Sequence, residues 1–207
     1  MIEKLFVVGL TGPTGSGKSE VSRVLENRDI HVIDADLLAR KVVEPGTECL
    51  KKLVEAFSDK ILNLDGTLNR KELARLAFSS LESSKLLNSI THPYIIAMTK
   101  TILMNMEQAR EAMAVIDAPL LFESGMDTIC DLTVAVVAPY EVRLQRILKR
   151  DKNLDEKQAR ARMSVQQPEQ YYTQRAAIVL NSSGDLDQLR AQAEELARNI
   201  REWAYEK

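Results

Sequence analysis

The stretch that most limits how this chain can fold is GLTGPTGSGKSEVSRVL, residues 9–25, which holds four of the chain's eight glycines. Within it, GPTGSGKS (residues 12–19) matches the pattern G-x-x-x-x-G-K-[ST] in full. An apolar run precedes this segment and a helical pattern, residues 18–28, follows it. The segment is therefore expected to be a loop that leads from a strand into a helix.

Such a loop is suited to bind phosphate groups. Glycines let successive backbone N–H groups turn toward phosphate oxygens, and the helix N-terminus adds a partial positive charge. The pattern predicts a nucleoside triphosphate site, with Lys18 at the β- and γ-phosphates and the Ser19 hydroxyl on Mg²⁺. The residues expected to contact the nucleotide here are Gly12, Pro13, Thr14, Gly15, Ser16, Gly17, Lys18, Ser19 and Glu20.

Five short, almost continuous apolar runs predict the rest of the fold. They cover residues 5–10, 31–35, 113–119, 132–138 and 176–181, and continuous runs are typical of strands buried on both faces of a parallel sheet. Helical patterns follow at 139–150 and from 185 to about 203. The sequence predicts a three-layer α/β fold with a five-stranded parallel sheet.

One connection is too long for a single crossover. Between the second and third runs, helical patterns near residues 49–57, 70–78 and 84–109 predict an inserted helical lobe at the carboxyl edge of the sheet, where α/β proteins bind ligands. We expect one domain, with a core of about 1–45, 111–138 and 176–207. The insertion is expected at about 46–110 and a helical lid at about 139–175.

Composition excludes several classes of protein. The 207 residues include 28 Lys and Arg against 30 Asp and Glu, a net charge of −2, so a broad basic surface for nucleic acid is not expected. We expect no signal peptide, because the segment MIEKLFVVGLTG lacks the pattern of one, and no membrane span, because no apolar stretch is long enough. Cys49 and Cys130 have no metal-binding spacing and are expected to be reduced. We expect a cytoplasmic protein, with a monomer slightly favoured.

Three carboxylates follow predicted strands. Asp34 and Asp36 come at the end of the second run, where one could accept a proton from a substrate hydroxyl or help to position Mg²⁺. The alternative is that one of them caps the helix that begins next. Asp117 ends the strand expected within the third run, where a carboxylate would reach Mg²⁺ through water.

The segment VRLQRILKRD, residues 142–151, carries arginines on a predicted helix. Arg143, Arg146 and Arg150 are spaced so that they share roughly one face. A solvated charged face would explain this pattern. A mobile lid would also explain it, because arginines that close over a triphosphate stabilise transition-state charge.

Taken together, these residues resemble the dephospho-CoA kinase family over about residues 5–184. The resemblance is carried by GLTGPTGSGKS, VIDADLLARKVVEPG, DGTLNRKELARLAF, THPYI, DAPLLFESGM, VRLQRILKRD and IVLNSSG. It implies transfer of the γ-phosphoryl group of ATP to the ribose 3′-hydroxyl of dephospho-CoA, giving coenzyme A and ADP, the last step of coenzyme A biosynthesis. The implied partners are ATP, Mg²⁺ and dephospho-CoA.

The resemblance also implies roles for individual residues. Asp36 would be the general base, with Asp34 as the second choice, and Arg146 would contact the phosphates, with Arg143 and Arg150 as alternatives. Asn181 would belong to the adenine pocket. The acceptor would be bound by Asp34, Asp36, Arg40, His92, Pro119, Leu120 and Leu121.

One residue has two possible roles, and two positions differ from the residue that is common in the family. Glu123 would belong to the acceptor wall or be a charge at a helix N-terminus. Thr14 stands where the family commonly has Ile, and Ala177 stands where it commonly has Asp. The rival interpretations are another nucleotide kinase, such as one that phosphorylates AMP, and a nucleotide switch without an acceptor.

Overall fold

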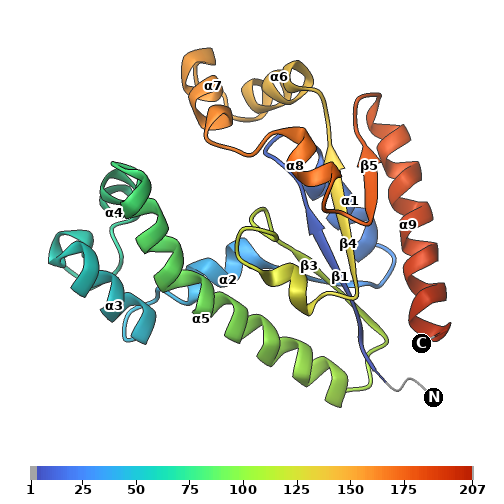
Figure 1. Cartoon of the computed structure of the whole chain (residues 1–207), viewed down its shortest axis with the longest axis horizontal. Helices are drawn as coiled ribbons and strands as arrows, with labels where there is room; N and C mark the ends of the chain where they lie inside the picture. Colours follow the sequence, from blue (N-terminus) through green and yellow to red (C-terminus); the bar gives the residue numbers. More distant parts are fainter. Residues whose placement is uncertain (1–3, 207) are drawn as a thin grey trace. The chain divides into compact units, whose positions relative to one another are not determined.

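The computed structural model describes residues 4–206 and contains a five-stranded sheet in the order β2-β3-β1-β4-β5 (Figure 1). The β1–β3, β1–β4 and β4–β5 pairs run parallel, and the predicted five-stranded parallel sheet is confirmed. The strands are β1 (Phe6–Thr11), β2 (His31–Asp34), β3 (Met113–Asp117), β4 (Leu132–Val137) and β5 (Ile178–Asn181).

The described chain divides into two compact units. One is formed by the residues up to Ile33 together with those from Met106 onward, and the other by Asp34–Asn105. We call them the sheet unit and the helical unit.

The sheet unit has its main core between one face of the sheet and two helices, α1 (Lys18–Glu26) and α9 (Leu186–Glu206). Side chains alternate across a strand, so Phe6, Val8 and Leu10 of β1 belong to this core. Figure 1 shows α9 running beside β5 and α1. The helix predicted from residue 185 thus forms and covers one face of the sheet.

The opposite face packs against shorter elements. Ala135 and Val137 of β4 form a cluster with Tyr172 of α8 (Glu169–Thr173). The β3–β4 connection contains a 3-10 turn, η2 (Met126–Ile129), which contacts β1. Because both faces are covered, the strands are apolar along almost their whole length.

The segment between β4 and α8 forms two helices. They are α6 (Tyr140–Arg150) and α7 (Glu156–Ser164), and their shared core contains Leu144, Ile147, Ala159 and Met163. A capping box at Asp155 and Gln158 starts α7. We call this pair the α6–α7 hairpin.

The helical unit contains α2 (Ala35–Lys41), α3 (Glu48–Phe57), the 3-10 turn η1 (Asp59–Ile61), α4 (Arg70–Ala77) and most of α5 (Leu81–Gln108). Thr47 and Asn69 cap α3 and α4 with side-chain oxygens that accept from backbone N–H groups. The three predicted helical patterns correspond to α3, α4 and α5.

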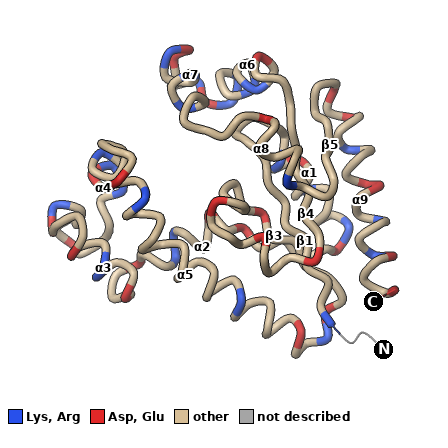
Figure 2. Tube along the Cα trace, in the orientation of Figure 1, with Lys and Arg blue, Asp and Glu red and all other residues tan. Residues whose placement is uncertain are grey.

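Charges of both signs are interspersed along the helices of each unit (Figure 2). Cys49 and Cys130 are both free thiols, as predicted, and burial raises the pKa of Cys130 to about 12. Among the residues that the structure describes, no helix combines the length and apolar character needed to cross a bilayer.

Candidate active site

The phosphate loop, residues 12–19, joins the end of the central strand β1 to the start of α1. Gly15 has φ +82°, and a Cβ there would lie 2.8 Å from the carbonyl oxygen of Arg143. A Cβ at Gly12 would lie 2.2 Å from the carbonyl oxygen of Val136. Only glycine fits this backbone path, which curves tightly against β4 and α6.

The loop offers unoccupied donors suited to an anion. Gly17 is the N-cap of α1 and has no side chain to cap it, so N–H groups of the first turn remain available to a ligand. The buried hydroxyl of Ser16 has no hydrogen-bond partner in the described part of the chain. A polyphosphate would supply acceptors for both kinds of group, so the loop fits the nucleotide that the sequence predicts.

Lys18 and Asp117 meet beside this loop. The register pairs Leu10 of β1 with Asp117 of β3, so the carboxylate lies at the same edge of the sheet as the loop. The Lys18 Nζ donates to Asp117 Oδ1, and the Ser22 hydroxyl donates to Asp117 Oδ2 at 2.5 Å. Ser22 lies one turn after Lys18 on α1, and the sequence analysis did not single it out.

This arrangement fits a magnesium ion bound together with a nucleotide. Mg²⁺ prefers oxygen ligands and keeps several waters. The Ser19 hydroxyl and the Asp117 carboxylate are such ligands, and the contacts of Asp117 with Lys18 and Ser22 favour a water-mediated role. Within residues 4–206, no group of three or more His, Cys, Asp or Glu side chains is placed to hold a metal alone.

The three α6 arginines, which share roughly one face by their spacing, have different environments in the structure. Arg146 reaches the loop, where its Nη1 donates to Gly15 O at 3.4 Å and Ser16 O at 3.3 Å. Arg143 is also turned inward and is only 6% exposed, because it packs against the loop backbone. Arg150 is exposed and donates to Asp151 Oδ2 at 3.0 Å.

Ser182 is a further residue that the sequence analysis did not single out. It is 1% exposed; its hydroxyl accepts from Arg146 Nη1 at 2.8 Å and its carbonyl from Nη2 at 2.9 Å. The segment IVLNSSG, which carries part of the family resemblance, was the only signal for it.

Two residues expected near the nucleotide have structural contacts. The Glu20 carboxylate accepts from Arg23 at 2.5 Å and from Arg190 of α9 at 2.6 Å, and these bonds hold the pKa of Glu20 below its usual value. Asn181 ends β5, and its Oδ1 accepts from the N–H of Ser183 at 2.9 Å. Glu20 thus joins α1 to α9, and Asn181 shapes the turn after β5.

The carboxylates after β2 belong to the helical unit. Asp34 is the N-cap of α2, and its Oδ1 accepts from the N–H groups of Asp36 and Leu37 at 2.8 and 3.1 Å. Asp36 lies in the first turn of α2 and is exposed. The cap foreseen as an alternative is therefore Asp34, which leaves Asp36 as the better candidate for a base.

Arg40 and His92 also lie in the helical unit. The Arg40 carbonyl accepts from Arg70 at 3.5 Å, while the Arg40 residue itself is exposed. His92 lies in α5, next to Pro93, and its half-buried position lowers its pKa.

The segment after β3 contains both exposed and buried side chains. The Pro119 carbonyl accepts from the Thr11 hydroxyl at 3.2 Å, and Leu120 is 45% exposed. Leu121 is fully buried, so its side chain belongs to the core and offers no surface to an acceptor. Glu123 has one buried carboxylate oxygen without a partner among the described residues, and desolvation raises its pKa.

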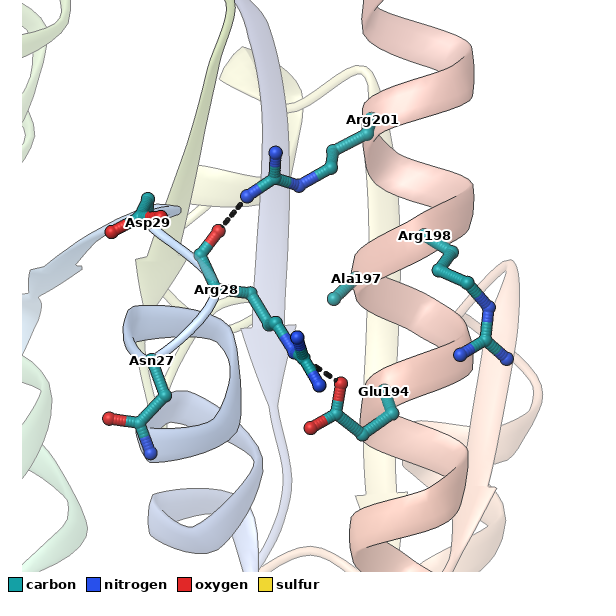
Figure 3. Close-up of a pocket in the computed structure, with 7 residues that line it drawn as sticks. All are labelled: Asn27, Arg28, Asp29, Glu194, Ala197, Arg198 and Arg201. Atoms are coloured by element: carbon teal, nitrogen blue, oxygen red, sulfur yellow. Dashed lines mark hydrogen bonds and ion pairs between the residues drawn. The ribbon is translucent and has the colours of Figure 1, made fainter.

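A pocket of about 330 Å³ lies elsewhere on the sheet unit, between the C-terminal end of α1 and α9 (Figure 3). Arg28 donates to Glu194 at 2.6 Å across it, and Arg201 donates to the Arg28 carbonyl. The helix rise places this pocket about 13 Å along α1 from the phosphate loop. Its polar groups join α1 to α9, and none of the predicted site residues lines it.

A phosphate loop at the end of a central parallel strand, with Lys18 beside an aspartate of the neighbouring strand, defines the chain as a P-loop nucleotide-binding protein. A family model described as Dephospho-CoA kinase matches residues 6–188. The chain belongs to the dephospho-CoA kinase family, as the resemblance predicted.

Individual relatives agree with this family. The chain is 44% identical to a dephospho-CoA kinase of Corynebacterium efficiens, over 93% of this chain and 96% of the relative. It is 41% identical to that of Moorella thermoacetica, over 95% and 94%. A structure of dephospho-CoA kinase from Campylobacter jejuni superposes with a TM-score of 0.70 at 26% identity, covering 94% of this chain and 96% of the other. A shikimate kinase from Acinetobacter baumannii, with a TM-score of 0.52 and 18% identity over 97% of this chain and 96% of the other, shares the fold alone.

Proposed function

We propose that this chain transfers the γ-phosphoryl group of ATP to the ribose 3′-hydroxyl of dephospho-CoA, and releases coenzyme A and ADP. The observation that carries the proposal is the family match over residues 6–188 together with a phosphate loop whose lysine lies beside Asp117. A fold of this kind also supports other phosphoryl transfers, so the family match identifies the acceptor.

In the proposed reaction, the 3′-oxygen attacks the γ-phosphorus and the bond to the β–γ bridging oxygen breaks. Asp36 accepts the hydroxyl proton. Lys18 and Arg146 stabilise the charge that develops on the transferred group. Mg²⁺, bound by Ser19 and through water by Asp117, would supply charge neutralisation on the phosphates.

The remaining sequence-based assignments are part of the same proposal. We assign the adenine of ATP to the region of Asn181, and the acceptor to Asp34, Arg40, His92, Pro119 and Leu120. A cytoplasmic location and a monomeric state stay predictions from the sequence.

A direct assay separates this function from its rivals. Purified protein is incubated with ATP and Mg²⁺ and one of three acceptors, dephospho-CoA, AMP or shikimate, and the products are separated by chromatography. We expect coenzyme A and an equal amount of ADP only with dephospho-CoA. Phosphorylation of AMP without phosphorylation of dephospho-CoA would overturn the proposal, and so would equal ATP consumption with and without an acceptor.

A further inference from the structure

Gln166 contacts the phosphate loop at two points. Its Oε1 accepts from the backbone N–H of Thr14 at 3.2 Å, and its Nε2 donates to the Thr14 hydroxyl at 2.9 Å. The side-chain amide thus meets one donor and one acceptor of the same loop residue. Neither the sequence pattern nor the family resemblance singled out Gln166.

Arg143 extends this contact into a network. Its Nη1 lies 3.4 Å from both Gln166 Oε1 and the Thr14 carbonyl. Arg143 is buried, and its backbone lies against Gly15. The network therefore holds Thr14 through its N–H, its carbonyl and its hydroxyl.

The position of Gln166 connects the loop to the α6–α7 hairpin. Gln166 follows the last turn of α7, and its N–H donates to the carbonyl of Met163 at 3.1 Å. Met163 lies in the apolar core between α6 and α7, so this hydrogen bond ties the backbone at Gln166 to the hairpin. Gln166 is half-buried although its apolar neighbour Val165 is 84% exposed. Such a reversal of the usual burial indicates that hydrogen bonding decides where Gln166 lies.

We propose that Gln166 is a positioning residue for the phosphate loop. Its amide holds Thr14 so that the following N–H groups stay aimed at a polyphosphate, and it makes nucleotide affinity depend on the placement of the α6–α7 hairpin. The inference rests on the proposed function only for the identity of the nucleotide. A pre-arranged loop binds its ligand more tightly because less ordering is required on binding.

The first test replaces Gln166 by Leu, which keeps its approximate size and removes both hydrogen bonds. The matched control is Gln167→Leu at the neighbouring exposed position. Dissociation constants for ATP with Mg²⁺ are measured by titration calorimetry, and kcat and KM by the acceptor assay. We expect Gln166→Leu to raise the Kd of ATP about five- to tenfold. This loss of binding free energy equals the net contribution of about one hydrogen bond. The KM of the acceptor should stay unchanged in Gln166→Leu. The Kd of ATP should stay unchanged in Gln167→Leu.

A second pair of variants keeps the test decisive if Gln166→Leu does not fold. Thr14→Val removes the hydroxyl acceptor, whereas Thr14→Ser keeps it. We expect Thr14→Val to weaken ATP binding about two- to fivefold and Thr14→Ser to weaken it less, because serine keeps a hydroxyl acceptor for Gln166 Nε2. The double variant Gln166→Leu with Thr14→Val should bind ATP no more weakly than Gln166→Leu alone, because both changes remove the same contact.

Several results would overturn the inference. These are native-like ATP affinity in folded Gln166→Leu, additive losses in the double variant, or equal effects of Val and Ser at position 14. A merely structural role would lower the melting temperature of Gln166→Leu without raising the Kd of ATP. Because ATP binding is measured without acceptor, failure of dephospho-CoA phosphorylation would leave this test readable and would count against the proposed function alone.

Discussion

Lys18 shows how one side chain can serve both the fold and the chemistry. Its ammonium pairs with Asp117, which is nearly buried, and the loop that precedes it is shaped for phosphate. Removal of the ammonium should therefore affect stability as well as turnover, although the motif alone predicts only a loss of turnover.

For Lys18→Ala we expect a loss of at least about 100-fold in kcat, since a charged donor to the transferred phosphoryl group is removed. We also expect about 1–3 kcal/mol less stability, because Asp117 keeps only its bond from Ser22. Activity assays and chemical denaturation measure the two effects. Lys149→Ala, at an exposed position of α6, is the control, and near-native turnover in Lys18→Ala would disprove the role of the loop lysine.

Replacing Asp34 and Asp36 by asparagine, one at a time, should distinguish their roles. Asparagine caps helices about as well as aspartate, so Asp34→Asn should keep the fold and lose much less kcat than Asp36→Asn, with any effect mainly on the KM of the acceptor. Asp36→Asn should reduce kcat about 10²–10⁴-fold, the usual contribution of a general base, with ATP affinity nearly unchanged. An unaltered kcat in Asp36→Asn, combined with a large loss in Asp34→Asn, would transfer the role of base to Asp34.

The partly buried position of the Glu123 carboxylate lowers the stability of the folded protein. Desolvation raises its pKa above 4.5, and the Arg175 guanidinium offsets this only in part. The folded state then holds the proton more tightly than the unfolded state, so stability falls as the pH rises from about 4.5 through the folded-state pKa.

Glu123→Gln should therefore stabilise the protein at pH 8, because glutamine keeps the size of the side chain and removes the desolvated charge. Below pH 4.5 the advantage should disappear, because the native carboxyl is then neutral as well. Denaturation curves at pH 4 and pH 8 test this expectation. An equal difference at both values would mean that the charge of Glu123 is not the cause.

At the scale of elements, some turns of α6 contact the phosphate loop and others face away from it. Arg146 bonds to two loop carbonyls and to Ser182, whereas Arg150 pairs with its neighbour Asp151. The same residue type on one helix therefore gives a matched pair of variants.

Arg146→Ala should slow phosphoryl transfer about 10³-fold, at the lower end of the range for arginines that stabilise the transferred group. Arg150→Ala should change kcat less than twofold. Single-turnover kinetics with saturating ATP separate the chemical step from binding. Similar losses in both variants would show that α6 acts through its overall charge and not through Arg146.

The elements that could be predicted are those with a strong local pattern. Continuous apolar runs marked all five strands, since strands buried on both faces have no polar side. The hairpin contacts could not be foreseen, because α7 is mostly polar and its link to the loop is a single glutamine, Gln166. The burial of Arg143 could not be foreseen for a related reason: spacing places residues on a helix face, but packing against the loop at Gly15 determines which of them are buried.

At the scale of the whole molecule, the residues assigned to the proposed reaction are divided between the two compact units. The phosphate-binding groups belong to the sheet unit, whereas Asp36, Arg40 and His92 belong to the helical unit. The boundary between the units follows Ile33, near the end of β2. The sequence analysis placed the start of the insertion later, at about residue 46, because local apolar and helical patterns do not show the limits of compact packing.

The central claim is that the triphosphate of ATP binds to residues 12–19, and a crystal structure with a non-hydrolysable ATP analogue and Mg²⁺ tests it most directly. We expect the phosphate oxygens within hydrogen-bond distance of the backbone N–H groups of residues 15–19, with Lys18 Nζ on the β- and γ-phosphates. A triphosphate bound elsewhere, such as at the arginines of the pocket between α1 and α9, with the loop empty, would contradict the account.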